Sequence, residues 1–437
     1  MALVPTVTSP RQLVSIVSLI GGLAWLAVGC GARTGLELPD AEPLNVEDAG
    51  VMDAAPDAPA DAGVDAECIE VPFEGEPIEV ALETEAEIGR ADVVFLVDST
   101  ASMQAEIDTI RNRLENQLAP AIRDAIPDSQ LGVATFQDFP VGPYGDRGDT
   151  PFQLITASTA DVSQVQAGVA AIRTGDGMDP PESQVEALYQ LATGEGIGGF
   201  VPPSPGCPSG GVGYACLRTD ALPVVLLFTD APFHNGPGGS NPYTGIVPSP
   251  HTYGQMTDEL DRLGTRVIGF GSGGGDERAD LREIALDTGA IDRTGRPLVF
   301  DIGTSGQRLG TEVVNAIRTF ASDAVFDVDL LLVDPAPGDG VDVTGFVERV
   351  VPVRADPADG LGSIDEEAGV FREVSAGTLV VFELVIGNDA VVPGPEPQTF
   401  RLDVVFRADG LARIARTSVE LTVPGEDGMG CEVPDGG

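Results

Sequence analysis

Between about Ala91 and Ala324, short apolar runs alternate along the chain with segments of helical periodicity. The apolar runs, which are typical of buried strands, cover 93–97, 131–136, 222–228, 265–270 and 297–300. The helical patterns cover 103–122, 160–172, 181–192, 252–263, 276–287 and 305–321. Nearly continuous apolar strands separated by amphipathic helices indicate a mostly parallel sheet that is covered on both faces. We therefore predict a doubly wound α/β domain over residues 90–323.

After residue 324 the apolar period changes to two, in runs at 326–332, 380–386 and 400–406 that are separated by Pro- and Gly-rich turns. This pattern predicts an antiparallel, Ig-like β-sandwich over 324–425, followed by a tail at 426–437. Residues 68–89 alternate in a similar way, with Ile78, Val80 and Leu82 on one side. They indicate one or two further strands ahead of the α/β domain.

The start of the chain has the pattern of a targeting segment. One base, Arg11, precedes an apolar run from Leu13 to Val28, which predicts a signal peptide over 1–29. The ending LAVGC resembles a bacterial lipobox, and this resemblance implies that Cys30 is lipidated. The alternative is an ordinary secretory signal with an incidental cysteine. Because Gly31 rather than Asp follows the cysteine, we expect an outer-membrane lipoprotein, at the periplasmic face or at the cell surface.

The charge balance excludes one class of partner. The sequence has 69 acidic and 24 basic residues, a formal net charge of −45. Such a surface repels nucleic acid and anionic membranes and concentrates divalent cations. Residues 30–67 are rich in Asp, Ala and Pro, so we predict a disordered acidic tether behind the lipid anchor.

Four further cysteines fit export to an oxidising compartment, where an even number indicates disulfides. Three pairings are possible. Cys207 and Cys216 flank a short Gly-rich loop that can close locally, which leaves Cys68 to pair with Cys431. Four free thiols are the alternative.

One strand ends in an unusual group of oxygens. The stretch VVFLVDSTASM (93–103) places Asp98 at the end of an apolar run, with Thr100 and Ser102 at alternate positions behind it. One carboxylate and two hydroxyls are ligands for a hard cation such as Mg²⁺, and neutral hydroxyls leave the ion part of its charge. The alternative is that these residues cap a helix.

Two other segments carry acids at comparable places. TGDGMDPPES (174–183) supplies Asp179 and Glu182 just before a helix, and VVLLFTDAPFH (224–234) ends a strand with Asp230. With DSTAS, these segments resemble the metal-ion-dependent adhesion site of von Willebrand factor A (vWA) domains, most closely that of integrin β I-like domains and bacterial vWA proteins. The resemblance implies a set of ligands that coordinates Mg²⁺, or Mn²⁺ or Ca²⁺ in its place. Its ligands would be Asp98, Thr100, Ser102, Glu182 and Asp230, with Thr174 and Asp179 as possible additional ligands.

The sequence departs from integrin β domains at their two flanking Ca²⁺ sites. Ala105 and Glu106 stand where the resemblance implies paired acids, and Gly177 stands where it implies Asn. Asp179 alone matches, so we expect no second metal. We also expect His234, four residues after Asp230, to be a solvated loop residue. Because integrin β I-like domains are inserted into a sandwich, we expect the strands on both flanks to form one sandwich; two domains in series are the alternative.

The hypothesis that unites these features is an exported, lipid-anchored adhesion module whose metal captures an Asp or Glu of a partner protein. One alternative is an envelope scaffold that its metal merely stabilises. Another is an exported metal-dependent hydrolase. The sequence has no G-x-S-x-G motif and no apparent nucleophile–base pair, so we do not expect an enzyme.

Overall fold

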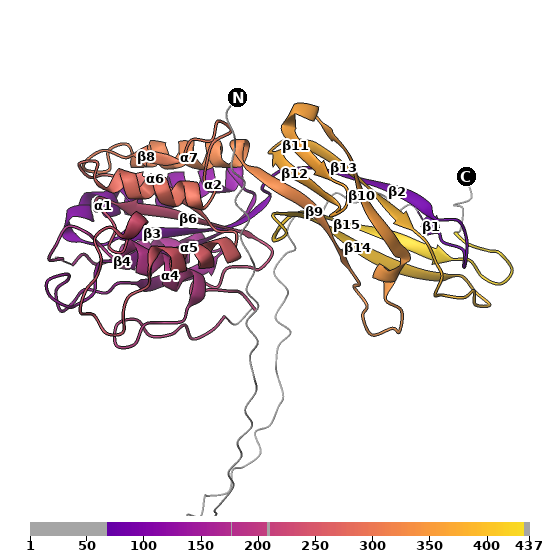
Figure 1. Ribbon diagram of the computed structural model, residues 1–437, viewed down its shortest axis with the longest axis horizontal. Coiled ribbons are helices and arrows are strands. Elements are labelled where there is room, and N and C mark those ends of the chain that lie inside the picture. The colour runs from indigo at the N-terminus through magenta and orange to yellow at the C-terminus, as the bar shows by residue number, and fades with distance from the viewer. Residues whose placement is uncertain (1–67, 176, 208–209, 432–437) are drawn as a thin grey trace, which may run out of the picture. The chain divides into compact units, whose positions relative to one another are not determined.

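The computed structural model describes residues 68–175, 177–207 and 210–431 (Figure 1). The predictions of a signal peptide at 1–29, of lipidation at Cys30 and of a tether at 30–67 lie outside the described residues, as does the tail from 432. Within the described residues, no helix is both long enough and apolar enough to cross a membrane.

The α/β domain is built on one six-stranded sheet with the order β5-β4-β3-β6-β7-β8. All neighbours are parallel except β4 and β5. This confirms the predicted doubly wound, mostly parallel sheet. The strands are β3 Arg90–Asp98, β4 Asp128–Phe136, β5 Gln153–Thr159, β6 Leu222–Thr229, β7 Arg266–Gly271 and β8 Val299–Asp301.

Helices cover both faces of this sheet (Figure 1). They are α1 Gln104–Arg113, α2 Ala119–Ala125, α3 Val162–Ala171, α4 Gln184–Thr193, α5 Tyr253–Arg262, α6 Glu277–Asp287 and α7 Leu309–Asp323. Alternate residues of β3 enter two separate cores: Phe95 packs with α1, α2, α3 and α7, and Leu96 packs with α4 and α5. Burial on both faces explains the nearly continuous apolar runs of the central strands, such as 93–97 in β3.

Two elements of this domain differ from the sequence pattern. The helix predicted over 103–122 is interrupted by a π turn, η2 Leu114–Leu118, just before Pro120 in the first turn of α2. Proline has no N–H to donate to the preceding turn, so the helix changes its hydrogen bonding there. Strand β5 was not predicted, because it is a partly exposed antiparallel edge strand without a continuous apolar run.

The second domain is an antiparallel sandwich. One sheet has the order β1-β15-β14-β9-β12-β11 and the other the order β10-β13-β2. Phe382 of β13 contacts Phe371 of β12 (ring centroids 4.8 Å apart) and Phe406 of β14 (6.0 Å), so the two sheets pack face to face. The strands are β1 Cys68–Glu70, β2 Ile78–Glu85, β9 Val325–Val333, β10 Val347–Asp356, β11 Leu361–Asp365, β12 Val370–Ser375, β13 Leu379–Ile386, β14 Gln398–Ala408 and β15 Ala412–Val423.

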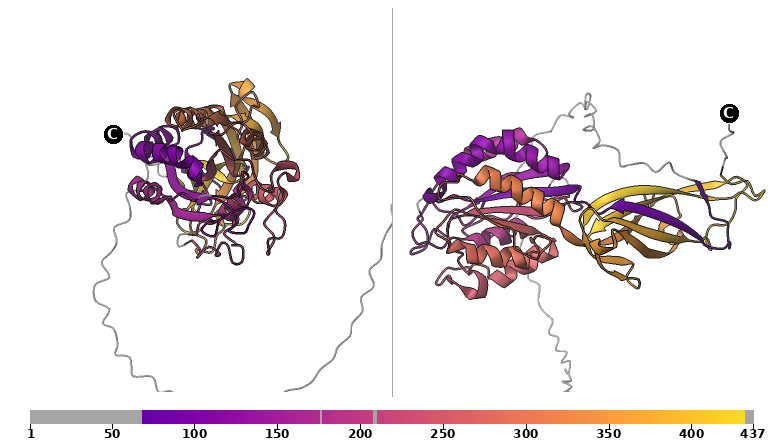
Figure 2. Two further views of the ribbon diagram at one scale, coloured as in Figure 1. Left: turned by 90° about the vertical axis from the view of Figure 1, so that its left-hand side faces the viewer. Right: turned by 90° about the horizontal axis from the view of Figure 1, so that it is seen from above.

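Strands from both flanks of the α/β domain make up this sandwich. β2 pairs with β13 over its whole length, from Ile78 opposite Ile386 to Glu85 opposite Leu379, and β1 runs parallel to β15. Figure 2 shows this early segment among the late strands of the sandwich. The α/β domain is therefore an insert between β2 and β9 in chain order.

Two disulfides are present. Cys68 bonds to Cys431 across 363 residues of chain, so it joins the two ends of the described part. Cys207 bonds to Cys216 nine residues later and closes the local Gly-rich loop.

We expect Phe382→Ala to lower the free energy of unfolding by about 3–5 kcal/mol, because it leaves a cavity between the two sheets. The control is Val353→Ala on β10, whose residue is 39 % exposed, with an expected loss under about 1 kcal/mol. Urea unfolding of both variants measures the difference. Equal losses would contradict the packing described for the two sheets.

Candidate metal centre

Asp98 and Asp230 follow neighbouring strands of the α/β sheet. β3 ends at Asp98, and β6 ends at Thr229, one residue before Asp230. The two strands are parallel, with Val97 opposite Phe228, so their carboxyl ends lie together. The Thr229 hydroxyl also donates a hydrogen bond to Asp98 Oδ2 (2.8 Å). Both acids therefore lie at the edge where ligands bind in open parallel sheets.

The loop after β3 connects these two acids through hydroxyl groups. Thr100 donates to Asp98 Oδ1 from its N–H (2.9 Å) and from its hydroxyl (2.7 Å). Thr100 Oγ1 lies 3.1 Å from Ser102 Oγ, which donates to Asp230 Oδ1 (3.2 Å). Four side chains from two loops thus form one continuous chain of oxygens.

Helix capping does not account for this arrangement. Thr100 precedes the 3₁₀ turn η1 Ala101–Met103, but its side chain makes no capping hydrogen bond to that turn. Asp161 and Ser163 show what the same local pattern does elsewhere: the Asp161 carboxylate accepts from the Ser163 N–H and hydroxyl and caps α3 at an exposed position. Asp98 differs because it is completely buried and other oxygens converge on it.

Glu182, on the segment before α4, brings a third carboxylate to the same place. Its backbone is held on both sides, because its N–H donates to Pro232 O (3.0 Å) and its carbonyl accepts from the His234 N–H (2.8 Å). A Cβ added to Gly177 would lie 3.2 Å from Glu182 Oε1 and 3.7 Å from Thr100 Cγ2. The Glu182 carboxylate therefore lies close to the Thr100 side chain.

The electrostatics of this group are unfavourable without a cation. Burial, and next repulsion from Asp230, raises the pKa of Asp98 to about 7, although Thr100 and Thr229 donate to it. Burial, followed by repulsion from Asp98 and other nearby carboxylates, raises the pKa of Glu182 to about 11. Glu182 Oε2 is buried and has no hydrogen-bond partner among the described residues. An unpartnered buried carboxylate oxygen is costly, and a bound cation would remove that cost.

Hydrogen bonds join Asp98, Thr100, Ser102 and Asp230, and Glu182 lies near Thr100. Among the described residues, however, Asp98, Glu182 and Asp230 do not form a group whose ligand atoms all lie within 4.8 Å of one another. Their role as ligands stays a prediction. The other two candidates lie outside this group. The Thr174 hydroxyl donates to Gln104 Oε1 (3.3 Å) instead. Asp179 belongs to a second group, described below.

The donor set of this first group fits a hard cation. All five side chains offer oxygen only, as Mg²⁺, Mn²⁺ and Ca²⁺ prefer. Asp98, Thr100 and Glu182 are buried, whereas Ser102 is exposed and Asp230 is partly exposed. The group is thus closed on its inner side and open to solvent at Ser102.

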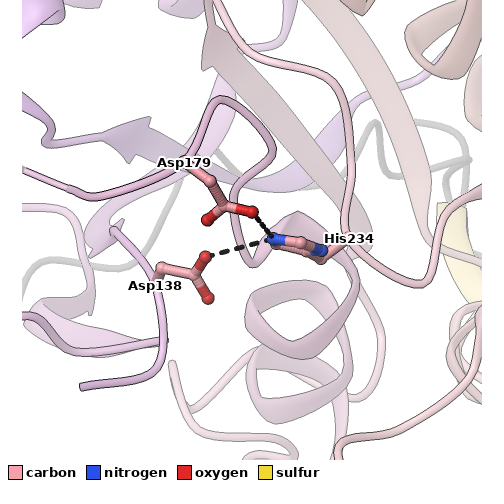
Figure 3. Close-up of side chains that lie close together, drawn as sticks. All are labelled: Asp138, Asp179 and His234. Atoms are coloured by element: carbon pink, nitrogen blue, oxygen red, sulfur yellow. Dashed lines mark ion pairs between the residues drawn. The ribbon is translucent and has the colours of Figure 1, made fainter. Parts of the chain in front are cut away.

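A second group contains Asp138, Asp179 and His234, whose ligand atoms all lie within 4.8 Å of one another and could hold a metal ion (Figure 3). His234 Nε2 lies 3.4 Å from Asp138 Oδ2 and 3.3 Å from Asp179 Oδ2. Burial is the main cause that raises the pKa of Asp138 to about 8.

This second group was not predicted from the sequence. The expectation that His234 is a solvated loop residue was wrong, since only 3 % of its surface is exposed. Asp138 lies two positions after the end of β4 at Phe136, much as Asp230 directly follows β6, and this placement was the available signal. The burial of His234 gave no signal in the sequence pattern, because it depends on packing between loops, with Tyr144 and Tyr243.

No protein-family model matches the sequence, and no curated protein matches it significantly. Similar solved structures include a von Willebrand factor type A protein from Catenulispora acidiphila (12 % identity, TM-score 0.36), with 82 % of this chain and 72 % of that chain covered. Another is proximal thread matrix protein 1 from the mussel byssus (16 %, TM-score 0.33), at 57 % and 51 % coverage. The pilus adhesin SpaC from Lactobacillus rhamnosus GG (14 %, TM-score 0.33) is covered at 80 % and 46 %. This chain spans about half the length of the last two. Likeness at this level carries no argument about function.

We expect Glu182→Gln to stabilise the metal-free protein at pH 8 by about 1–3 kcal/mol, because it removes an unpartnered buried acid. The folded-state pKa of Glu182 is raised, so its contribution to stability is fully present below about pH 4.5 and is lost as the pH rises toward 11. Thermal unfolding in EDTA between pH 4 and pH 8 should show a difference from wild type that grows with pH. Added Mg²⁺ should stabilise wild type more than this variant.

Glu186, one helical turn later, provides the matched control. Its carboxylate accepts from the His251 N–H (2.9 Å) and lies 3.0 Å from His251 Nδ1. Glu186→Gln should therefore destabilise the protein under the same conditions. If Glu182→Gln were destabilising at every pH, the Glu182 carboxylate would have a stabilising partner in the folded protein, which would contradict the unpartnered Oε2.

Proposed function

We propose that the protein is an exported, lipid-anchored module that binds a partner protein through a divalent metal ion. Asp98, Thr100, Ser102, Glu182 and Asp230 would hold Mg²⁺, or Mn²⁺ or Ca²⁺ in its place. The observation that carries the proposal is the chain of four hydrogen-bonded oxygen side chains, with the Glu182 carboxylate, whose Oε2 has no partner among the described residues, near Thr100. When bound, the ion would supply a positive centre at an otherwise acidic surface.

The five residues differ in burial, and we propose that their roles in the site differ accordingly. Asp98 is fixed from three sides, by the Thr100 N–H, the Thr100 hydroxyl and the Thr229 hydroxyl, so it would anchor the site. Ser102 and Asp230 form the accessible rim. Two of the five donors are neutral hydroxyls, which leave more charge for an outside ligand than a cage of carboxylates would.

The charge of the chain favours an acidic ligand group bound in this particular way. A net charge of −45 repels an acidic partner everywhere except where a cation intervenes. We therefore propose that an Asp or Glu of the partner completes the site. The resemblance to integrin β I-like domains and bacterial vWA proteins supports this reading, as does the insertion of the α/β domain between β2 and β9.

We also propose that the protein is an outer-membrane lipoprotein, facing the periplasm or the cell surface. Its two disulfides fit an oxidising compartment. The LAVGC sequence and the acidic stretch at 30–67 provide for an anchor and a spacer. The proposal includes no catalysis, because no nucleophile–base pair is apparent in the sequence.

We expect Asp98→Ala to abolish Mg²⁺ binding by the full chain, as measured by calorimetry, and to reduce partner capture from envelope extract at least about 10-fold. EDTA should reduce capture by wild type to the same degree. The matched control is Asp161→Ala, which removes an exposed carboxylate with the same local hydrogen bonds from Ser163 and should leave both readouts unchanged.

Two outcomes would replace this proposal. Capture that survives both EDTA and Asp98→Ala would favour a scaffold whose metal only stabilises the fold. Metal-dependent turnover of a substrate would favour a hydrolase. In either case Mg²⁺ binding and its loss in Asp98→Ala would still be measured separately from capture.

A further inference from the structure

The three described sheets have six edge strands, and these differ in how well they resist pairing with another strand. β1 and β8 have only three residues each, and β11 has five. β10 contains Pro352 and two register shifts. β5 also has two register shifts, and its Ser158 N–H donates to Ala215 O (2.9 Å). Shortness, proline, bulges and covering segments are devices with which natural proteins protect sheet edges.

β2 is the sixth edge strand, and among the described residues none of these devices protects it. It lies at the end of the smaller sheet and pairs with β13 over all eight residues without a register shift (Figure 1). Outside this ladder, the backbone from Ile78 to Thr84 makes no hydrogen bond within the described part of the chain. A regular, uncovered edge of this length is a template for one more strand.

The inner row of side chains on β2 consists of Ile78, Val80 and Leu82. Leu82 is only 8 % exposed, whereas Ile78 and Val80 are partly buried against the core of the sandwich. Apolar side chains of an added strand would lie beside this row and cover what remains exposed. The inner row therefore favours a strand with apolar residues at every second position.

The outer row is acidic, with Glu79, Glu83 and Glu85 all exposed. Glu79 and Glu85 form no ion pair among the described residues, and Glu83 Oε2 lies 3.9 Å from Arg354 Nη2. Residues 68–89 as a whole carry seven acidic residues and no basic one. Opposite charges on facing positions stabilise a pair of strands, so the outer row favours Arg or Lys on an added strand.

The same charges disfavour two other occupants of this edge. A second copy of β2 would place acids beside acids. Residues 34–67, which precede β1 in the chain, contain no basic residue, so they cannot balance the outer row either. Like charges on facing strands destabilise the pairing, and the acidic row thus discriminates against both.

We propose that β2 is a docking edge for an extended segment of a partner protein in which Arg or Lys alternates with apolar residues. The segment would add a fourth strand to the sheet β10-β13-β2. Its apolar residues would pack beside the inner row, and its basic residues would pair with the outer row. Main-chain hydrogen bonds would supply affinity, and the two rows would supply specificity. This interaction needs no metal, so it is independent of the proposed function.

The test uses the full chain in EDTA, which keeps metal out of the proposed first centre (Asp98, Thr100, Ser102, Glu182 and Asp230). The probe is a fluorescent peptide of about ten residues, alternating Arg and Val, which is long enough to span β2. Fluorescence anisotropy should show saturable binding. A peptide with the same residues in two blocks, and one that alternates Glu and Val, should each bind at least about 10-fold more weakly.

Hydrogen exchange followed by mass spectrometry locates the bound peptide. Amides of residues 78–85 should exchange more slowly in the complex, because the outward N–H groups of β2 gain partners. Amides of the α/β domain should exchange as they do in the free chain.

Variants test the acidic row. Glu79→Arg/Glu85→Arg should weaken binding of the Arg–Val peptide at least about 10-fold and should bind the Glu–Val peptide instead. The matched control is Glu366→Arg/Glu367→Arg, which changes two exposed acids between β11 and β12 by the same charge and should bind as wild type does. All four positions are exposed, so the midpoint of thermal unfolding should not change.

Four results would overturn the proposal. Equal binding of the alternating and the blocked peptide would show a general attraction to an acidic chain. Slower exchange in the α/β domain rather than at 78–85 would place the peptide elsewhere. Self-association of the free chain that slows exchange at 78–85 would make a second copy the occupant. Absence of any binding would mean that the outer row only keeps strands apart. Mg²⁺ binding and its loss in Asp98→Ala are measured separately from all four.

Discussion

Mutual repulsion among buried carboxylates is the constraint on which the functional edge of this protein depends. Asp98, Glu182 and Asp138 are each at most 4 % exposed. Burial is the main cause of the raised pKa of each one, and neighbouring carboxylates add to it. A folded protein keeps such an arrangement at a cost in stability. A bound cation would remove that cost, because it would neutralise part of the buried negative charge.

The sheet imposes this crowding. β4, β3 and β6 are adjacent and parallel. β3 ends at Asp98, and β4 and β6 are followed within two residues by Asp138 and Asp230. Parallel neighbours end at the same edge, so acids that are far apart in the sequence must meet there. Hydrogen bonds with loop residues then divide these acids into two groups. Thr100, Ser102 and Thr229 join Asp98 to Asp230, whereas Tyr243 and the Asn241 carbonyl orient Asp138 and His234. One edge thereby carries an oxygen-only group and a mixed nitrogen–oxygen group.

The connection from the sandwich into the α/β domain is made at the other end of β3. β3 begins at Arg90, five residues after β2 ends, and α7 ends at Asp323, two residues before β9 begins. Arg90 is at the amino end of β3, and Asp98 is at its carboxyl end. Both groups therefore lie at the opposite end of β3 from this connection. The Cys68–Cys431 disulfide closes the sandwich at the ends of the described chain.

The sequence by itself determined the doubly wound sheet and the period-two sandwich, because periodicity records which faces are buried. The five residues of the first centre were named from a family resemblance, and their role as ligands stays a prediction. The sequence did not reveal β5, whose partly exposed edge position leaves no continuous apolar run. It also misjudged His234 and did not reveal the group that His234 forms with Asp138 and Asp179. Loop burial depends on partners such as Tyr144, which is 90 residues earlier in the chain yet packs 5.2 Å from the imidazole. Only the tertiary structure decided that Asp179 belongs with His234 rather than with Asp98, because periodicity specifies which side of an element is buried but not which loop lies against it.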